Sequence, residues 1–185
     1  MKKIVLLFAA VLLVAWVGSA SAFELSFRNG PTFNVRNWVS TQYKIGLNFA
    51  STSKGAAAGF YSSTSIDLSV MKGVTGIWLT PEFQYDIKLP GIPLYIYPKI
   101  GIDLLFAWLP GSVKDIGFGI KPAIGAKFDL TENIFIWAEP FGLNIIFAQY
   151  SWGPGTGGIP GIAQGGWTKT AAMSYDMMLG VGFRL

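Results

Sequence analysis

The chain has 185 residues, of which 14 are basic and 10 acidic, and it contains neither histidine nor cysteine. Charged residues make up 13% of it, against about 25% in ordinary soluble domains, and aromatic residues reach 15%. The composition excludes disulfide stabilisation and the common zinc and haem ligand sets. The small excess of positive charge does not indicate a nucleic-acid partner.

The first 22 residues have the pattern of a cleaved signal peptide. Two lysines precede an apolar run over residues 4–17, and Ala20 and Ala22 supply the small residues of the cleavage site. We therefore expect a signal peptide over residues 1–22 and one domain of net charge +2 over residues 23–185. An uncleaved anchor is the alternative, but the run is shorter than the roughly 20 residues that span a bilayer.

Apolar and polar residues alternate along most of the chain after residue 22. In residues 94–108, for example, Ile100 and Ile102 lie on one face of an extended chain, and Lys99 and Asp103 lie on the other. This period predicts half-polar β-strands. No later apolar run is long enough for a membrane helix, so the pattern favours an all-β fold, a closed antiparallel up-and-down transmembrane β-barrel.

Eight strands are predicted, at residues 23–29, 40–50, 62–71, 77–89, 93–109, 116–129, 133–150 and 171–185. An even number places both ends of the barrel domain on the periplasmic side. The tight turns near residues 90–91 and 131–133 would then be periplasmic, and the Gly/Pro-rich stretch 153–166 extracellular. Residues 51–61 are long for a periplasmic turn, which counts against this orientation.

Four of the predicted strands contain a proline followed by alternating residues. Proline has no N–H to donate to a neighbouring strand and is normally found at sheet edges or bulges. A soluble fold with edge strands would tolerate such prolines more easily, whereas in a closed barrel we expect a bulge at each one. The four residues are Pro81, Pro98, Pro122 and Pro140.

The alternation does not say which face is enclosed, and a soluble lipocalin-like binding barrel would have the apolar face inside. The polar face, however, is dominated by Gly, Ser, Asn and Gln, which suits a crowded interior better than a water-facing surface. We therefore expect the charged residues of this face to line the interior. They are Glu24, Arg28, Lys44, Asp67, Glu82, Asp86, Lys88, Lys99, Asp103, Lys121, Lys127, Asp129, Glu139, Asp176 and Arg184.

Enclosed charges must find partners because unpaired burial is costly. Glu139 needs a bulge near Pro140 to face inward. The network would plug the barrel, and a selective pore or proton path is the alternative. Rough strand registers predict three interior ion pairs: Glu82 with Lys99, Asp103 with Lys121, and Glu24 with Arg184.

Aromatic side chains near the strand ends are typical of the girdles at membrane interfaces. The candidates are Trp38, Trp78, Trp108, Tyr150, Trp152 and Trp167. The predicted extracellular loops carry a basic excess that suits lipopolysaccharide phosphates, although ordinary solvated charge is the alternative. The residues concerned are Arg36, Lys72, Lys114 and Lys169, against Asp115.

The chain resembles the superfamily of small outer-membrane barrels similar to the OmpA membrane domain, OmpX and OmpW. The resemblance covers residues 23–185 and rests on the strand pattern and the terminal sequence SYDMMLGVGFRL, which looks like a C-terminal insertion signal. It ends in leucine and not in an aromatic residue, so Phe183 would serve in its place. The signal residues are Tyr175, Leu179, Val181, Phe183 and Leu185.

This resemblance implies a monomer in the Gram-negative outer membrane, in contact with its lipid and with lipopolysaccharide, and inserted by the barrel-assembly machinery. Without histidine or cysteine, Ser-His and Cys-His catalysis are excluded. Glu82 and Asp86 share a face beside Lys99, where ion pairing is the simpler account than acid–base catalysis. We expect no enzyme and no cofactor. Two roles remain open: a structural or surface-interaction barrel, and a narrow channel for small solutes, apolar ones included.

Overall fold

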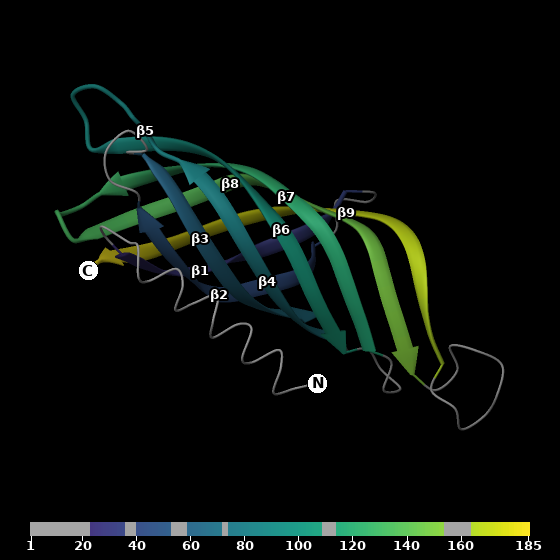
Figure 1. Cartoon of the computed structure of the whole chain (residues 1–185). Coiled ribbons are helices and arrows are strands. Elements are labelled where there is room, and N and C mark those ends of the chain that lie inside the picture. The colour runs from purple at the N-terminus through teal and green to yellow at the C-terminus, as the bar shows by residue number, and fades with distance from the viewer. Residues whose placement is uncertain (1–22, 36–39, 53–58, 72–73, 109–113, 154–163) are drawn as a thin grey trace.

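The structure, a computed structural model, describes residues 23–35, 40–52, 59–71, 74–108, 114–153 and 164–185. These residues form one antiparallel sheet that closes on itself (Figure 1). Its strands are β1 (Phe23–Asn34), β2 (Ser40–Thr52), β3 (Phe60–Met71), β4 (Val74–Tyr85), β5 (Ile87–Lys88), β6 (Leu94–Trp108), β7 (Lys114–Asp129), β8 (Ile134–Gly153) and β9 (Gln164–Arg184). Both β4 and β5 pair with β6 in one register, so together they form a single barrel strand.

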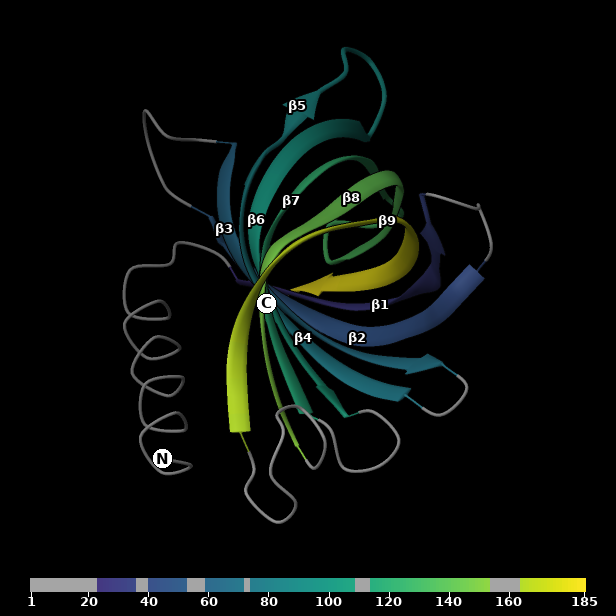
Figure 2. The same ribbon diagram turned by 90° about the vertical axis from the view of Figure 1, so that its right-hand side faces the viewer.

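The sheet is an eight-stranded up-and-down barrel, as the alternation predicts. Each barrel strand pairs with the strands before and after it in sequence, and the ring closes because β1 pairs with β9 as well as with β2. Figure 2 shows the strands wrapping around a common axis. Closure leaves no free sheet edge, since every strand has two neighbours.

Three strands extend well beyond their predicted bounds, β8 and β9 at their shared end and β1 at its C-terminal end. β8 and β9 remain paired as far as Gly153 and Gln164, inside the Gly/Pro-rich stretch that the sequence analysis takes as a loop. Strand β1 runs five residues past the predicted end, through Pro31. Composition predicts these strand ends poorly, because the backbone of glycine can form ladder hydrogen bonds with a neighbouring strand.

The tight turns and the C-terminal residue lie at one end of the barrel (Figure 1). In the first turn the Leu89 N–H donates to the Leu94 carbonyl at 2.9 Å, and Gly91 has a φ of 78°, which suits glycine. The predicted signal peptide with Ala20 and Ala22 lies outside the described residues, as do Arg36, Trp38 and Lys72. No helix among the described residues is long and apolar enough to cross a membrane.

The barrel has its polar residues inside and its apolar residues outside, as predicted. Large apolar side chains such as Phe83, Ile102 and Leu179 are more than half exposed on the outer face. Lys88 and Lys114, at strand ends, are the exposed basic residues among the described side chains. The prediction that Lys88 lines the interior is therefore wrong: the strand is interrupted at Asp86, and both residues of β5 are exposed.

The strand prolines sit where pairing with one neighbouring strand is interrupted. Around Pro122, β7 and β8 pair at Ile120 and again at Ala123 in the same register, and β4 and β6 behave alike around Pro81. Only at Pro140 does the register shift, between Glu139 and Gly142. The prediction of a bulge at each proline is therefore wrong for Pro81, Pro98 and Pro122, because a two-residue gap accommodates the missing N–H without an extra residue.

Three aromatic side chains in the interior lie over glycines on the neighbouring strand. They form the cross-strand pairs Tyr97 with Gly125, Phe135 with Gly182, and Trp137 with Gly180. A Cβ atom at Gly182 would lie 2.2 Å from the Phe135 ring. These glycines therefore make room for the rings, which fill part of the barrel lumen.

Candidate functional site: the enclosed charge belt

Eight buried charged side chains cross the barrel interior, and each of the eight barrel strands contributes one. We call this set the charge belt. In strand order its members are Arg28, Lys44, Asp67, Glu82, Lys99, Lys121, Glu139 and Asp176, all of them buried. The interior face of every strand is thus tied to the same layer of the lumen.

The belt is a continuous series of ion pairs with equal numbers of basic and acidic groups. Arg28 lies 3.1 Å from Asp67 and 3.8 Å from Glu82. Lys99 then joins Glu82, at 3.0 Å, to Glu139, at 2.5 Å.

Lys121 and Lys44 continue the series. Lys121 bridges Glu139 and Asp176 at 3.3 Å each, and Lys44 lies 2.9 Å from Asp176. Thr32 donates a further hydrogen bond to Asp176 at 2.7 Å. Each belt charge has a partner of opposite sign, which compensates the cost of removing it from water.

The bulge at Pro140 places Glu139 in the belt. Trp137 and Glu139 face inward before it, and Gly142 and Asn144 face inward after it, so the inward parity of β8 changes at the bulge. The sequence analysis identifies this need from the position of Glu139. An unbulged strand would turn either Glu139 or Asn144 towards the outer face.

One predicted ion pair is absent, because Asp103 and Lys121 are not within ion-pair distance. Both face inward from adjacent strands, but Gly119 lies opposite Asp103, and Lys121 lies opposite Gly101. The observed register between β6 and β7 differs by two residues from the predicted one. A shift of two keeps each side chain on its predicted face but changes the residue opposite it. Asp103 instead accepts a hydrogen bond from Thr80 at 2.9 Å.

The same two-residue difference affects the pair of Glu82 and Lys99. Lys99 lies opposite Gln84 and not opposite Glu82, but its long side chain still reaches the Glu82 carboxylate. Glu24 and Arg184 are direct cross-strand partners, with 2.8 Å between Arg184 Nε and Glu24 Oε1. The structure thus brings together two of the three predicted pairs.

A second group of charges, the end cluster, lies at the barrel end where β1 begins and β9 ends. Lys127 contacts Glu24 at 3.2 Å and Asp86 at 2.5 Å. Arg184 bridges Glu24 and Asp129, at 2.8 and 2.7 Å. The cluster therefore ties the two closing strands to β7 and to the end of β4.

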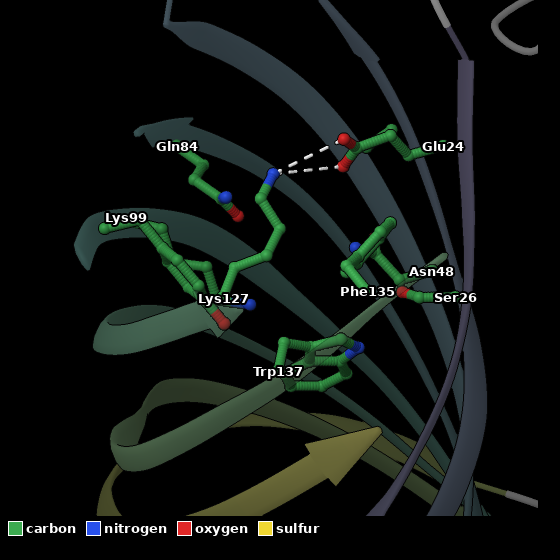
Figure 3. Close-up of a pocket in the computed structure, with 10 residues that line it drawn as sticks. Glu24, Ser26, Asn48, Gln84, Lys99, Lys127, Phe135 and Trp137 are labelled. Carbon is green, nitrogen blue, oxygen red and sulfur yellow. Dashed lines mark hydrogen bonds and ion pairs between the residues drawn. The ribbon is translucent and has the colours of Figure 1, made fainter. Parts of the chain in front are cut away.

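A small cavity of about 20 Å³ lies between the charge belt and the end cluster. This is room for about one water molecule. Figure 3 shows the Lys127 amine directed at Glu24, with Gln84 and Lys99 on one side of the cavity and Ser26 and Asn48 on the other.

The sequence analysis misplaced two interior residues. Trp78, predicted in an interfacial girdle, is buried with its Nε1 donating to Ser69 at 3.1 Å and the Lys44 amine 3.8 Å from its ring centroid. Asp115, predicted in a loop, is buried in β7 and accepts from Gln149 at 2.7 Å. Strict alternation from Thr80 and Glu82 would have placed Trp78 inside.

Of the other girdle candidates, Tyr150 is half-buried. Trp108 is exposed on the outer face. Trp152 and Trp167 are strand residues opposite Gly165 and Tyr150, but their side chains lie outside the described part, as does that of Lys169.

The residues of the predicted insertion signal line the outer face of β9 and the chain end. Leu179, Val181, Phe183 and Leu185 are exposed, and the Tyr175 hydroxyl donates to the Pro140 carbonyl. This bond reaches the carbonyl across the gap between β8 and β9.

The chemistry of the enclosed groups is that of ion pairing. Within the described residues no group of three or more acidic side chains is arranged to hold a metal ion. Every acidic belt member contacts at least one amine or guanidinium group. The arrangement binds the eight strands to one another through the lumen.

Comparisons with known proteins support the fold without naming a family. No family model and no curated protein matches the chain. Among solved structures it is similar to the N-terminal β-barrel domain of Pseudomonas aeruginosa OprF, with 16% identity, a TM-score of 0.54, and coverage of 90% of this chain and 98% of that one.

Two further structures have the same architecture. Neisserial surface protein A has 13% identity and a TM-score of 0.54, with 88% of this chain and 95% of that chain covered. A major outer membrane protein from Thermus thermophilus has 9% identity and a TM-score of 0.60, with 89% and 98% covered. The chain therefore has the fold of the small outer-membrane β-barrels.

Proposed function

We propose that this protein is an integral outer-membrane barrel with a structural or surface-interaction role, and that the charge belt closes its lumen to solutes. The observation that carries the proposal is the belt itself: all eight strands contribute a buried charge, and each charge is paired across the lumen. The apolar outer face supports the membrane location, because such a surface is stable in lipid and not in water.

The absence of histidine and cysteine supports a non-catalytic role. We further propose that the chain acts as a monomer, since closure leaves no strand edge for another copy. Insertion by the barrel-assembly machinery would use the outward side chains from Tyr175 to Leu185. Lys114 and Lys169, predicted in loops, are strand residues of β7 and β9. The exposed Lys114, at the start of β7, would lie near lipopolysaccharide phosphates.

Planar-bilayer recordings and liposome swelling with the refolded domain, residues 23–185, test the closed lumen. We expect no steady conductance and no flux of small sugars or amino acids, because ion pairs span the lumen at the belt. Heat-modifiable gel migration and flotation with vesicles confirm that the tested protein is folded and inserted. Steady conductance by the inserted protein would contradict the closed lumen and favour the narrow channel.

A further inference from the structure

The wall of the barrel is interrupted where β4 gives way to β5. Gln84 pairs with Lys99 and Ile87 pairs with Ile96, but no pairing joins the two residues between them to β6. Pro98 has no N–H to donate across this gap. The Asp86 N–H donates instead to the Gly59 carbonyl, at 2.7 Å, on the other side of its strand.

An apolar groove of about 270 Å³ lies on the outer face at this break. We call it the wall groove. Its sides are formed by Phe60, Phe83, Tyr85, Pro98 and Ile100. The rings of Phe60 and Tyr85 pack against each other with 4.8 Å between their centroids, which gives the groove one aromatic side.

The wall groove and the small interior cavity share two lining residues. Gln84 and Lys99 line both hollows, and Figure 3 shows them at the inner one. The two hollows therefore lie on opposite sides of the same stretch of the barrel wall.

The polar ends of Gln84 and Lys99 are both bound on the inner side of the barrel wall. The Lys99 amine contacts Glu82 and Glu139, and the Gln84 amide donates to Asp86 at 2.5 Å. Both side chains are directed into the lumen, so the side chains that face the groove from the outer wall are the apolar ones. The groove thus offers hydrocarbon and aromatic surface, and its polar groups are engaged elsewhere.

We propose that the wall groove binds one acyl chain of a bilayer phospholipid. This inference rests on the proposed membrane location, which brings lipid chains into contact with the outer face. Association within lipid depends on packing contacts, because no water is displaced there. A hollow that stays empty loses those contacts, and a flexible chain can supply them.

The polar end of the phospholipid is expected at the turn end of the groove. Tyr85 carries a hydroxyl there, and the exposed Lys88 follows three residues later, with its amine 5.8 Å from the Tyr95 ring centroid. Tyrosine and lysine at the end of an apolar wall are typical of the level of lipid head groups.

Photolabelling tests the groove. The domain of residues 23–185 is refolded into phosphatidylcholine vesicles that contain a phosphatidylcholine with a diazirine in its acyl chain, and labelled residues are mapped by mass spectrometry. We expect labels to concentrate at Phe83, Tyr85 and Ile100, above the level at exposed residues of the opposite wall such as Leu179 on β9. Even labelling of the outer face would overturn the proposal.

A filling variant gives a second readout. Ile100→Trp places a larger side chain in the groove, and we expect labelling of Tyr85 to fall to the level of the opposite wall. Leu47→Trp, an equal change at an exposed position on β2, is expected to leave Tyr85 labelling unchanged. Unchanged labelling of Tyr85 in folded Ile100→Trp would also overturn the proposal.

Two further outcomes separate the alternatives. The same diazirine is also placed on a free fatty acid. If the fatty acid labels the groove and the phospholipid does not, the phospholipid is not the occupant. Vesicle flotation is measured first: protein that does not float overturns the membrane location and the groove proposal together. Protein that floats but labels evenly overturns only the groove proposal.

Discussion

At the scale of residues, Glu139 and Asp103 show how differently two enclosed carboxylates are held. Glu139 contacts both Lys99 and Lys121. Asp103 lies outside the series of ion pairs and accepts one hydrogen bond from Thr80. Burial alone therefore does not predict how much a charged side chain contributes to the stability of the fold.

Neutralising these two residues should have unequal effects on stability. Glu139→Gln leaves two buried amines without a shared carboxylate, and breaking such a buried network costs about 3 kcal/mol. Asp103→Asn keeps an acceptor for Thr80 and removes a buried charge, so we expect a change within about 1 kcal/mol. Unfolding in urea from lipid vesicles measures both values. Equal losses would contradict the distinction.

At the scale of elements, each strand proline interrupts the pairing with one neighbouring strand, and in most cases the register is the same on both sides of the interruption. The pairing of β6 with β7 continues through Pro122, so the nitrogen of that proline faces β8, where the gap lies. At Pro140 the register itself shifts. The same residue type thus has two structural consequences.

Replacing Pro122 should restore pairing, whereas replacing Pro140 should not. Pro122→Val supplies an N–H where β7 and β8 keep one register, so we expect a gain of about 1 kcal/mol, the net value of one hydrogen bond. Pro140→Val, at the shifted register, should give no such gain. The free energy of unfolding from vesicles tests this. A similar gain at both sites would show that the bulge can also be closed.

At the scale of the whole molecule, polarity is the reverse of that in a soluble barrel. The lumen contains a paired charge network and the outer face is apolar from β1 to β9. Tight turns join strands at one end, at Gly91 and Thr131. This asymmetry underlies the proposed orientation, with the turns in the periplasm.

Cysteine labelling in cells tests that orientation without interference, since the chain has no cysteine of its own. Thr131→Cys lies in an exposed turn at the proposed periplasmic end, and Gly157→Cys lies in the segment predicted to be extracellular. We expect a membrane-impermeant maleimide to label only Gly157→Cys on intact cells, and both variants after the outer membrane is opened. Labelling of Thr131→Cys alone on intact cells would reverse the orientation.

The sequence by itself determined the barrel class, the strand number and the enclosed polar face. A period of two assigns every side chain of a strand to one of two faces, and composition then tells which face suits lipid. Glu139 beside Pro140 even indicated a bulge, because regular alternation would have turned its charge outward.

Only the tertiary structure decided which charges meet. A register difference of two residues leaves the faces intact but replaces Asp103 by Glu139 and Asp176 as partners of Lys121. Contacts across the lumen, such as Arg28 with Asp67, join strands that are not neighbours in the sheet. Strand periodicity carries no information on these contacts, because they depend on how the sheet curves and closes.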